Sequence, residues 1–273
     1  MVDDTRIKQM FTEEADTKMV VCIHGQKGQG KTALSFGFPG KKYVLSFDRK
    51  SKRIKEYMYN NSNKIVIVDI IKFLTSQKDN YLESCVKTYE CTEMAIEEIG
   101  NRGDADWIIF DGLEVLIEMS EMKMRFDNQL LPFQGIANLS VWKDRKLNIR
   151  NIHEKAFQRV KKGIVYTTYT AKDEIVEEGQ IIAKRNIPSY IDIIMYQVDV
   201  VMESYIEFTK NKEATYKVHI KTSKIPIFKT GDVFDMTNKT INEVFFTKVP
   251  TKNNSSSKEA SKENENKLIE ELF

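Results

Sequence analysis

The sequence predicts an α/β fold with a mostly parallel β-sheet, helices on both of its faces, and antiparallel strands appended at the C-terminal side. Short, near-continuous apolar runs rich in β-branched residues are typical of strands buried on both faces. Segments with helical spacing separate these runs, which indicates parallel strands joined by helical crossovers. Beyond Asp199, strand-like runs follow one another without a helix between them.

The order of the expected elements follows from these patterns. Strands are expected at residues 19–24, 43–47, 65–68, 107–110 and 164–168, and helices at 31–37, about 80–99, 113–126 and 142–160. The later strands are expected at residues 200–208, 215–221 and 243–247. We expect an N-terminal extension over residues 1–17 and one domain over residues 18–250. Residues 251–273 are rich in Asn, Ser, Lys and Glu and are expected to form a disordered, acidic-hydrophobic tail.

Composition excludes several classes of protein. The 273 residues include 42 Lys and Arg and 40 Asp and Glu, so a nucleic-acid partner would need a local basic patch. No apolar stretch approaches the roughly 18 residues of a membrane span, and the first residues lack the apolar core of a secretory signal. Three cysteines without a Cys-x-x-Cys pair suggest reduced thiols and a cytoplasmic location.

Residues 25–32 carry the strongest motif, GQKGQGKT, which fits G-x-x-x-x-G-K-[ST] between an apolar run and a helical segment. Glycines at these positions allow backbone N–H groups to surround a phosphate, and the N-terminus of the following helix adds its dipole. The motif predicts that Lys31 reaches the β- and γ-phosphates of ATP and that the Thr32 hydroxyl binds Mg²⁺. The residues expected to contact the nucleotide are Gly25, Gln26, Lys27, Gly28, Gln29, Gly30, Lys31, Thr32 and Ala33.

A second acid is needed on the magnesium side of such a loop. The run WIIFD places Asp111 at the end of an apolar strand about 80 residues downstream, and we predict that Asp111 and Thr32 hold the metal. The alternative is a strand-end Asp that only caps the helix beginning at Leu113.

The carboxylate that activates water is harder to place. Glu114, in the first helical turn after Asp111, ranks first, followed by Asp48 at the end of YVLSFD and Asp69 at the end of IVIVD. Each could instead be a solvated or capping carboxylate. The strand expected at residues 164–168 ends in residues with hydroxyl groups, and Thr168 or Tyr169 would sense the γ-phosphate there. The alternative is that Thr and Tyr occur at this place because both are favoured in strands.

With this loop, Asp48, Asp111 and the Thr168/Tyr169 strand in this order, residues 18–205 resemble the RecA-like P-loop ATPases. The chain looks most like compact single-domain members from phages and archaeal viruses, which include AAA-type ATPases and RecA-like single-strand annealing proteins. The resemblance implies an additional strand between the loop strand and the Asp111 strand. It also implies assembly into rings or filaments, with ATP sites shared between protomers.

The resemblance further implies that two loops contact DNA. The first maps to residues 122–145, where cations alternate with aromatics as single-stranded DNA requires. Its candidate contacts are Lys123, Arg125, Phe133, Trp142, Lys143 and Arg145, although Phe133 and Trp142 could instead belong to the core. The second maps to residues 171–190, which begin with a small acidic hairpin around Gly179. Lys184 and Arg185 there are candidate fingers that act on a neighbouring protomer, or else a solvated basic pair.

One departure from the resemblance concerns water activation, because Lys50 stands where the recombinases usually have a Glu two residues past the strand-end Asp. The leading hypothesis is a Mg²⁺-dependent ATPase that acts on DNA, favoured as single-stranded, in recombination, repair or replication. The tip LIEELF could recruit a protein partner. The alternatives are a small-molecule or nucleotide kinase and a non-hydrolysing nucleotide switch or assembly protein.

Overall fold

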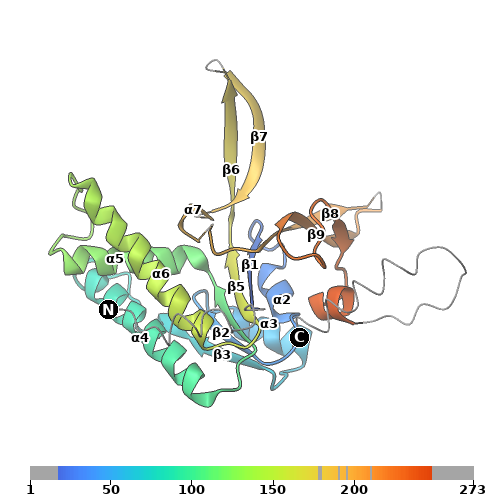
Figure 1. Ribbon diagram of the computed structural model, residues 1–273, viewed down its shortest axis with the longest axis horizontal. Coiled ribbons are helices and arrows are strands. Elements are labelled where there is room, and N and C mark those ends of the chain that lie inside the picture. Colours follow the sequence, from blue (N-terminus) through green and yellow to red (C-terminus); the bar gives the residue numbers. More distant parts are fainter. Residues whose placement is uncertain (1–17, 178–179, 190, 195, 210, 248–273) are drawn as a thin grey trace, which may run out of the picture.

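The fold is described from a computed structural model, which covers residues 18–247 except 178–179, 190, 195 and 210. Within these residues, eight strands form one sheet in the order β10-β9-β8-β1-β5-β4-β2-β3, and a separate hairpin consists of β6 and β7. Figure 1 shows the sheet with helices packed against it and the hairpin projecting from the body. The strands of the sheet are β1 (Met19–His24), β2 (Lys42–Ser46), β3 (Ile65–Asp69), β4 (Trp107–Asp111), β5 (Gly163–Thr168), β8 (Val200–Phe208), β9 (Ala214–Ser223) and β10 (Val233–Asp235).

The central strands are parallel, as their apolar runs predict. β1 pairs in parallel with β5 and β8, and β4 pairs in parallel with β5 and β2. β5 therefore lies between β1 and β4, which confirms the additional strand that the resemblance implies. By this strand order the fold is RecA-like.

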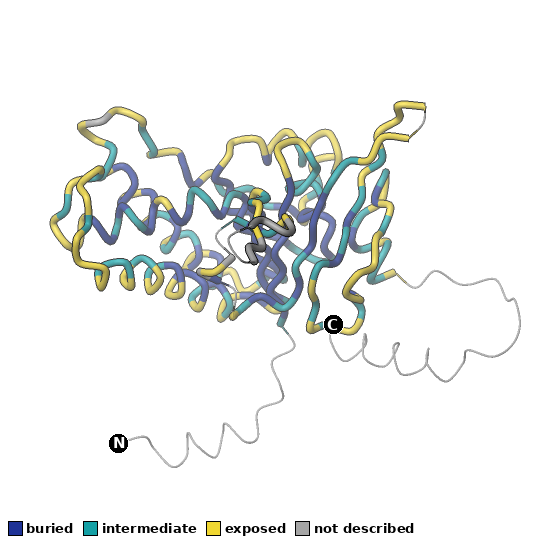
Figure 2. Tube along the Cα trace, turned by 90° about the horizontal axis from the view of Figure 1, so that it is seen from above, coloured by how far each residue is buried: buried dark blue, intermediate teal, exposed yellow. Residues whose placement is uncertain are grey.

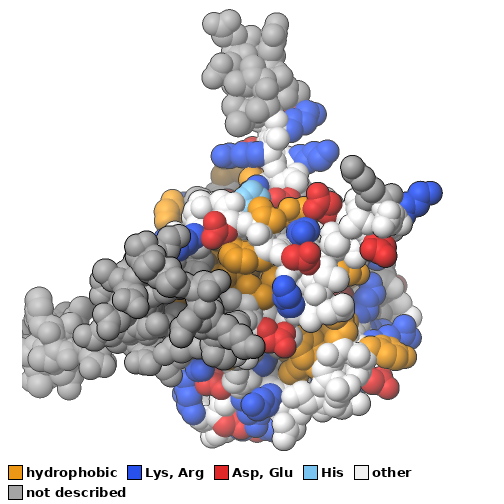
Figure 3. Space-filling view, turned by 90° about the vertical axis from the view of Figure 1, so that its right-hand side faces the viewer, with side chains coloured by type: hydrophobic (Ala, Val, Ile, Leu, Met, Phe, Trp, Pro, Cys, Tyr) orange, Lys and Arg blue, Asp and Glu red, His pale blue; other side chains and the backbone are white. Residues whose placement is uncertain are grey.

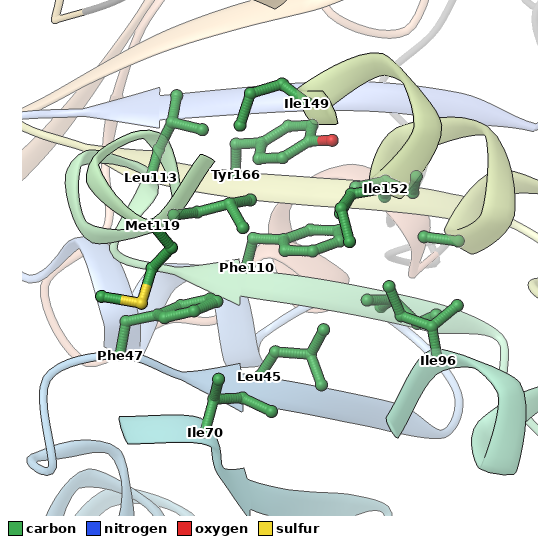
Figure 4. Close-up of a cluster of buried hydrophobic side chains, with 14 of the residues drawn as sticks. Leu45, Phe47, Ile70, Ile96, Phe110, Leu113, Met119, Ile149, Ile152 and Tyr166 are labelled. Atoms are coloured by element: carbon green, nitrogen blue, oxygen red, sulfur yellow. The ribbon is translucent and has the colours of Figure 1, made fainter. Parts of the chain in front are cut away.

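One face of the sheet is covered by three long helices, α4 (Tyr81–Arg102), α5 (Leu113–Asp127) and α6 (Trp142–Gln158). Alternate strand residues, including Leu45, Phe110 and Tyr166, pack against them in one core (Figure 4). The rings of Phe110 and Tyr166 stack with centroids 5.0 Å apart. The longest described helix, α4, is capped at its C-terminus by Gly103, whose φ of 66° lies in the left-handed region that favours glycine.

The other face is covered by the shorter helices α2 (Lys31–Phe36) and α3 (Ser51–Tyr59) and by the C-terminal segment. Strand residues of the opposite parity, such as Val21, Val44 and Ile109, form this second core with Phe36 and Phe38. Because both faces are buried, the strands need apolar residues at successive positions. Figure 2 shows the buried residues concentrated in the middle of the molecule and the exposed ones in its loops and on the outer sides of its helices.

The C-terminal strands extend the sheet beyond β1. β8 continues the parallel order, and β9 and β10 then add in antiparallel orientation. The strand predicted at residues 243–247 is wrong, because a π-helical turn spans Asn242–Phe246. Phe245 and Phe246 both lie against the ring of Phe228, at 4.7 and 6.0 Å between centroids. Consecutive residues of a strand would point to opposite faces, so a helical turn is needed for both rings to contact Phe228.

The projecting hairpin consists of β6 (Thr170–Glu177) and β7 (Gln180–Pro188) and is longer than the small hairpin predicted around Gly179. A four-residue helix, α7 (Ile191–Ile194), follows it, and short 3₁₀ turns lie at Ile70–Phe73, Lys78–Asn80 and Leu139–Val141. Among the helices that are described, none is both long and apolar enough to cross a membrane. The predicted N-terminal extension and acidic-hydrophobic tail lie outside the described residues.

Candidate nucleotide site

The parallel register brings the predicted site residues to one edge of the sheet. His24 at the end of β1 is level with Thr168 on β5, and Asp111 on β4 is level with Thr167 on β5 and Ser46 on β2. Ligands of open α/β sheets bind outside this carboxyl edge. The chain segments that leave these strand ends therefore form the walls of the candidate site.

The loop of residues 25–32 connects β1 to α2 and depends on glycine at three positions. Gly28 and Gly30 have φ of 86° and 80°, in the left-handed region that other residues rarely adopt. A Cβ on Gly25 would overlap the carbonyl oxygen of Ser204 on the neighbouring strand β8. The glycines that the motif requires are thus explained by backbone conformation and by close packing.

Lys31 is held at the start of α2 by the loop itself. Its ammonium donates to the carbonyl oxygens of Gly25 and Gln26, at 2.9 and 3.1 Å. It also lies 4.5 Å from the centre of the Tyr169 ring, a cation–π distance. Burial lowers the pKa of Lys31, while the nearby carboxylates of Glu114, Asp111 and Asp48 oppose that shift.

Asp111 is the centre of a cluster of hydroxyl groups. Its Oδ1 accepts hydrogen bonds from Thr32 at 2.8 Å and Thr167 at 2.7 Å, and its Oδ2 accepts one from Ser51 at 2.7 Å. Ser46 in turn lies 2.8 Å from the Ser51 hydroxyl. The contact between Thr32 and Asp111 brings together the two residues predicted to hold magnesium.

The chemistry of this cluster fits a hard cation. Burial raises the pKa of Asp111 above its usual range, although the hydrogen bonds from Thr167 and Ser51 work against the shift. A buried carboxylate surrounded by neutral hydroxyls gains stabilisation from a positive charge. Carboxylate and hydroxyl oxygens are also the ligands that Mg²⁺ prefers.

Glu114 lies in the first turn of α5 and faces the end of β5. Its Oε1 accepts a hydrogen bond from the Thr168 hydroxyl at 2.6 Å and another from the Tyr169 backbone N–H. Among the described residues, no hydrogen bond engages its Oε2. The structure thus brings Glu114, Thr168 and Tyr169 together at the cleft beside Lys31.

The other candidate carboxylates are placed differently. Asp48 also lines the cleft, but its side chain accepts a hydrogen bond from the Lys50 backbone N–H at 2.9 Å, which organises the turn before α3. Asp69 is exposed at the end of the edge strand β3 and does not line the cleft.

These groups open into a cleft of about 880 Å³, a volume typical of ligand pockets. One wall comes from α3, with Ile54, Tyr57 and Met58. The opposite wall comes from β9 and the turn at residues 236–240. Tyr216 on β9 reaches over the loop, because a Cβ on Gly30 would lie 3.3 Å from its ring.

Three of the four cations predicted to contact DNA in residues 122–145 are engaged in ion pairs. Lys123 pairs with Asp127, while Arg125 and Arg145 both pair with Glu121. Arg125 is buried and also donates to the carbonyl oxygens of Leu131 and Gln134, so it holds the loop after α5. Trp142 is half-buried beneath the Arg145 guanidinium, at 4.8 Å. Phe133 and Lys143 are exposed.

Lys184 and Arg185 lie on the projecting hairpin, away from the cleft of their own chain. They pair across the hairpin with Glu174 at 2.7 Å and Asp173 at 2.6 Å, and both remain exposed. A role in a neighbouring protomer stays a prediction.

Several residues of the site carry no local signal in the sequence. Ser51 lies in a basic helical segment, and Ser204 and Tyr216 lie on strands far along the chain, yet Ser204 donates a hydrogen bond to the loop carbonyl of Gln29. Thr167 stands in the TTYT run, where attention to strand-end hydroxyls could have found it.

Comparisons with known proteins concern the fold. No protein-family model matches the sequence, and no curated protein matches it. Among solved structures, the chain is similar to the RadB recombinase, with a TM-score of 0.43 and 10% identity over 85% of this chain and 94% of that one.

Two ATPases of type III secretion systems are also similar to this chain. One is a prototypical ATPase from pathogenic bacteria, with a TM-score of 0.42 and 10% identity over 71% of this chain and 52% of that one. The other is EscN from enteropathogenic E. coli, with a TM-score of 0.39 and 12% identity over 69% of this chain and 43% of that one. The chain spans about half the length of these two.

Proposed function

We propose that the protein is a Mg²⁺-dependent ATPase that acts on single-stranded DNA. The observation that carries the ATPase assignment is the hydrogen bond between Thr32 and Asp111, which joins the phosphate-binding loop to a buried strand-end carboxylate. The loop has two glycines in the left-handed conformation, a lysine at its end and oxygen ligands beside it. These features suit the binding of a nucleoside triphosphate with its metal ion.

The residues of the site have separate roles in binding ATP and its metal ion. The loop amides and Lys31 would bind the β- and γ-phosphates, and Thr32 and Asp111 would hold Mg²⁺. When bound, the metal neutralises the phosphate oxygens in the transition state. When the nucleotide binds, Lys31 exchanges its hydrogen bonds to the loop carbonyls for bonds to phosphate. Tyr169 lies beside Lys31 and shields the lysine and the phosphate from water.

Glu114 is the group that fits water activation. Thr168 and the Tyr169 N–H hold its Oε1, which leaves Oε2 to accept a proton from water. The water oxygen then bonds to the γ-phosphorus as the bond to the β–γ bridging oxygen breaks, which yields ADP and phosphate. Loss of the γ-phosphate would be transmitted through Thr168 and Tyr169 to the hairpin that follows.

The base of the nucleotide fits between the two walls of the cleft. Tyr216 lies over Gly30, and the α3 wall is apolar and aromatic at Ile54, Tyr57 and Met58. Flat, apolar surfaces on both sides suit a purine, whose faces stack on aromatic rings.

The test of the ATPase assignment is the variant Lys31→Ala, assayed for release of labelled phosphate. We expect turnover to fall to background while the thermal melting curve of the variant stays cooperative. Hydrolysis at the unaltered rate would refute the assignment. ATP binding without turnover in the unaltered protein would select the nucleotide switch instead, and transfer of phosphate to a nucleoside or nucleotide would select the kinase.

The nucleic-acid part of the proposal rests on surface chemistry, because cations and aromatic rings are exposed together at the carboxyl edge of the sheet. It is tested by the ATPase rate and particle size with and without single-stranded DNA across a salt series. We expect stimulation and larger particles with DNA, both lost as salt rises.

A further inference from the structure

The densest group of cations in the described part of the chain lies at the start of α3. Five of the seven residues from 49 to 55 are basic and none is acidic. Arg49, Lys50, Lys52 and Arg53 are all exposed. Among the residues that the structure describes, no carboxylate lies within 4 Å of a side-chain nitrogen of these four, unlike Lys123 and Arg125 of α5 and Arg145 of α6.

A second segment joins this group at the same edge of the sheet. The turn after β3 carries Lys72 and Phe73, both exposed, and Phe73 exposes 53% of its surface. The Arg49 guanidinium donates to the carbonyl oxygen of Ile71 at 3.4 Å, so the two segments lie side by side. We call Arg49, Lys50, Lys52, Arg53, Lys72 and Phe73 the α3 strip.

Local energetics do not explain the α3 strip. Helices favour acidic residues in their first turn, because the N-terminus carries a partial positive charge. The first turn of α3 has no acidic residue and instead carries Lys52 and Arg53. Like charges placed together at a helix N-terminus cost stability unless an anion from outside the chain neutralises them.

Two other surfaces within the described part of the chain lack this pattern. On the side where β8 and β9 lie in Figure 1, basic and acidic side chains are interspersed (Figure 3). On α5, Lys123 and Arg125 each pair with an acid one turn away. The α3 strip differs from these two surfaces in having cations without acidic partners beside an exposed ring.

We propose that the α3 strip binds the phosphate backbone of single-stranded nucleic acid, with Phe73 as a stacking platform for a base. This proposal deepens the proposed function and rests on its nucleic-acid part. Unpaired cations neutralise phosphates, and an exposed aromatic ring distinguishes a single strand, with its open base faces, from an acidic peptide. Lys50 belongs both to the α3 strip and to the nucleotide cleft, which places the bound nucleic acid beside the ATP site.

The test uses the full-length protein and a fluorescein-labelled oligothymidine, with binding followed by anisotropy across a salt series. The variant Lys52→Glu/Arg53→Glu changes two exposed residues that do not line the cleft. We expect its affinity to fall about tenfold or more and the slope of log affinity against log salt to lose roughly 1.4, since each single-strand contact contributes about 0.7. Its ATP turnover without DNA should be unchanged.

Two further variants separate the explanations. Lys143→Glu/Arg150→Glu removes two exposed cations from α6 and should leave the affinity within about twofold, which is near neutral on the free-energy scale. Phe73→Ala should weaken binding about tenfold without changing the salt slope, because stacking involves no counterion release.

Each other result would overturn the proposal. Loss of binding in the α6 pair but not in the α3 pair would move the nucleic acid to the loop after α5. Equal binding of a polyglutamate chain would make the partner an acidic protein. No binding of oligothymidine by the unaltered protein would remove both this surface and the nucleic-acid function, while the ATPase assignment would still stand or fall with Lys31→Ala.

Discussion

The carboxylate of Asp111 has a proposed role in metal binding, and its burial destabilises the folded protein. Its carboxylate is buried among three hydroxyl groups, and burial raises its pKa. In Asp111→Asn the amide can still bond to Thr32, Thr167 and Ser51, because a hydroxyl both donates and accepts. We therefore expect the melting temperature to stay the same or rise, while ATP turnover falls by roughly 100-fold or more through loss of the metal ligand.

The matched control is Asp106→Asn, near the opposite end of the same strand. Asp106 accepts a hydrogen bond from the Lys41 backbone N–H at 2.7 Å and lies far from the loop along β4. This variant should retain turnover. Full activity of Asp111→Asn would show that the carboxylate is not a metal ligand, and a strong loss of stability would show that the fold itself needs the ionised carboxylate.

Glu114 and Asp48 can be told apart by the same kind of substitution. In Glu114→Gln the side-chain oxygen still accepts from Thr168 and Tyr169, so the site keeps its shape but loses its base. We expect kcat to fall by about 10²- to 10⁴-fold with little change in ATP affinity, measured by single-turnover hydrolysis and by binding of a fluorescent ATP analogue. Asp48→Asn should retain most of kcat. The reverse pattern would make Asp48 the base.

At the scale of secondary structure, burial on both faces made the central strands predictable. The strand predicted at residues 19–24 has those bounds in the structure, and 107–110 is extended by Asp111 alone. The helix α3 was not predicted, and two further errors fall at the C-terminal side. The short β10 at Val233–Asp235 has no apolar run to mark it. The composition of the Phe-rich segment at residues 243–247 predicts a strand, although its two phenylalanine rings contact the same neighbour from a helical turn.

The close pairing of β1 and β5 leads to a prediction at Gly163. Gly163 has a φ of 146°, and a Cβ there would overlap the carbonyl oxygen of Met19. Because both groups are strand backbone, neither can move without breaking the ladder. We expect Gly163→Ala to lower the free energy of unfolding by about 3 kcal/mol or more, since clash and backbone strain add.

Gly103→Ala provides the comparison, since Gly103 also has a positive φ but no atom within 4 Å of the added Cβ. Its cost should be only the left-handed penalty of about 1–2 kcal/mol. Urea unfolding of both variants measures the difference. Equal losses would mean that β5 can shift away from β1.

For the molecule as a whole, the motif residues were predictable because each stands next to its partner along the chain or at a strand end. The contacts between distant segments were not. Ser51, Ser204 and Tyr216 reach the loop only because α3, β8 and β9 are placed around it by the strand order. No local pattern in the sequence encodes that order, so the parts of the cleft wall that come from α3 and β9 were absent from the sequence-based prediction.

Two buried histidines, His24 at the end of β1 and His153 on α6, predict how stability depends on pH. Burial lowers the pKa of His24 to about 4 and that of His153 to about 4, below the usual 6.5. His24 faces Glu203, Lys221, His219 and Lys31, and its Nδ1 lies 3.0 Å from the Thr170 hydroxyl. His153 has its Nδ1 2.9 Å from the Tyr166 hydroxyl. Both therefore stay neutral in the folded protein at pH values where the unfolded chain already protonates them.

The sign follows from proton uptake. Between pH 6.5 and 4 the unfolded state binds more protons at these two sites, so stability is fully present above pH 6.5 and is lost as the pH falls toward 4. The loss is on the order of 2–3 kcal/mol for each histidine. Asp111 works in the opposite direction, because its raised pKa favours proton uptake by the folded state.

The variant His153→Gln isolates one of these contributions. Glutamine can keep a hydrogen bond to Tyr166 but does not titrate, so the free energy of unfolding should fall less steeply between pH 6.5 and 5 than in the unaltered protein. Urea unfolding at several pH values gives both slopes, and only the difference between slopes matters, because the substitution also changes stability at neutral pH. Parallel curves would mean that His153 protonates in the folded state as readily as in the unfolded chain, and that its burial beside Tyr166 imposes no electrostatic cost.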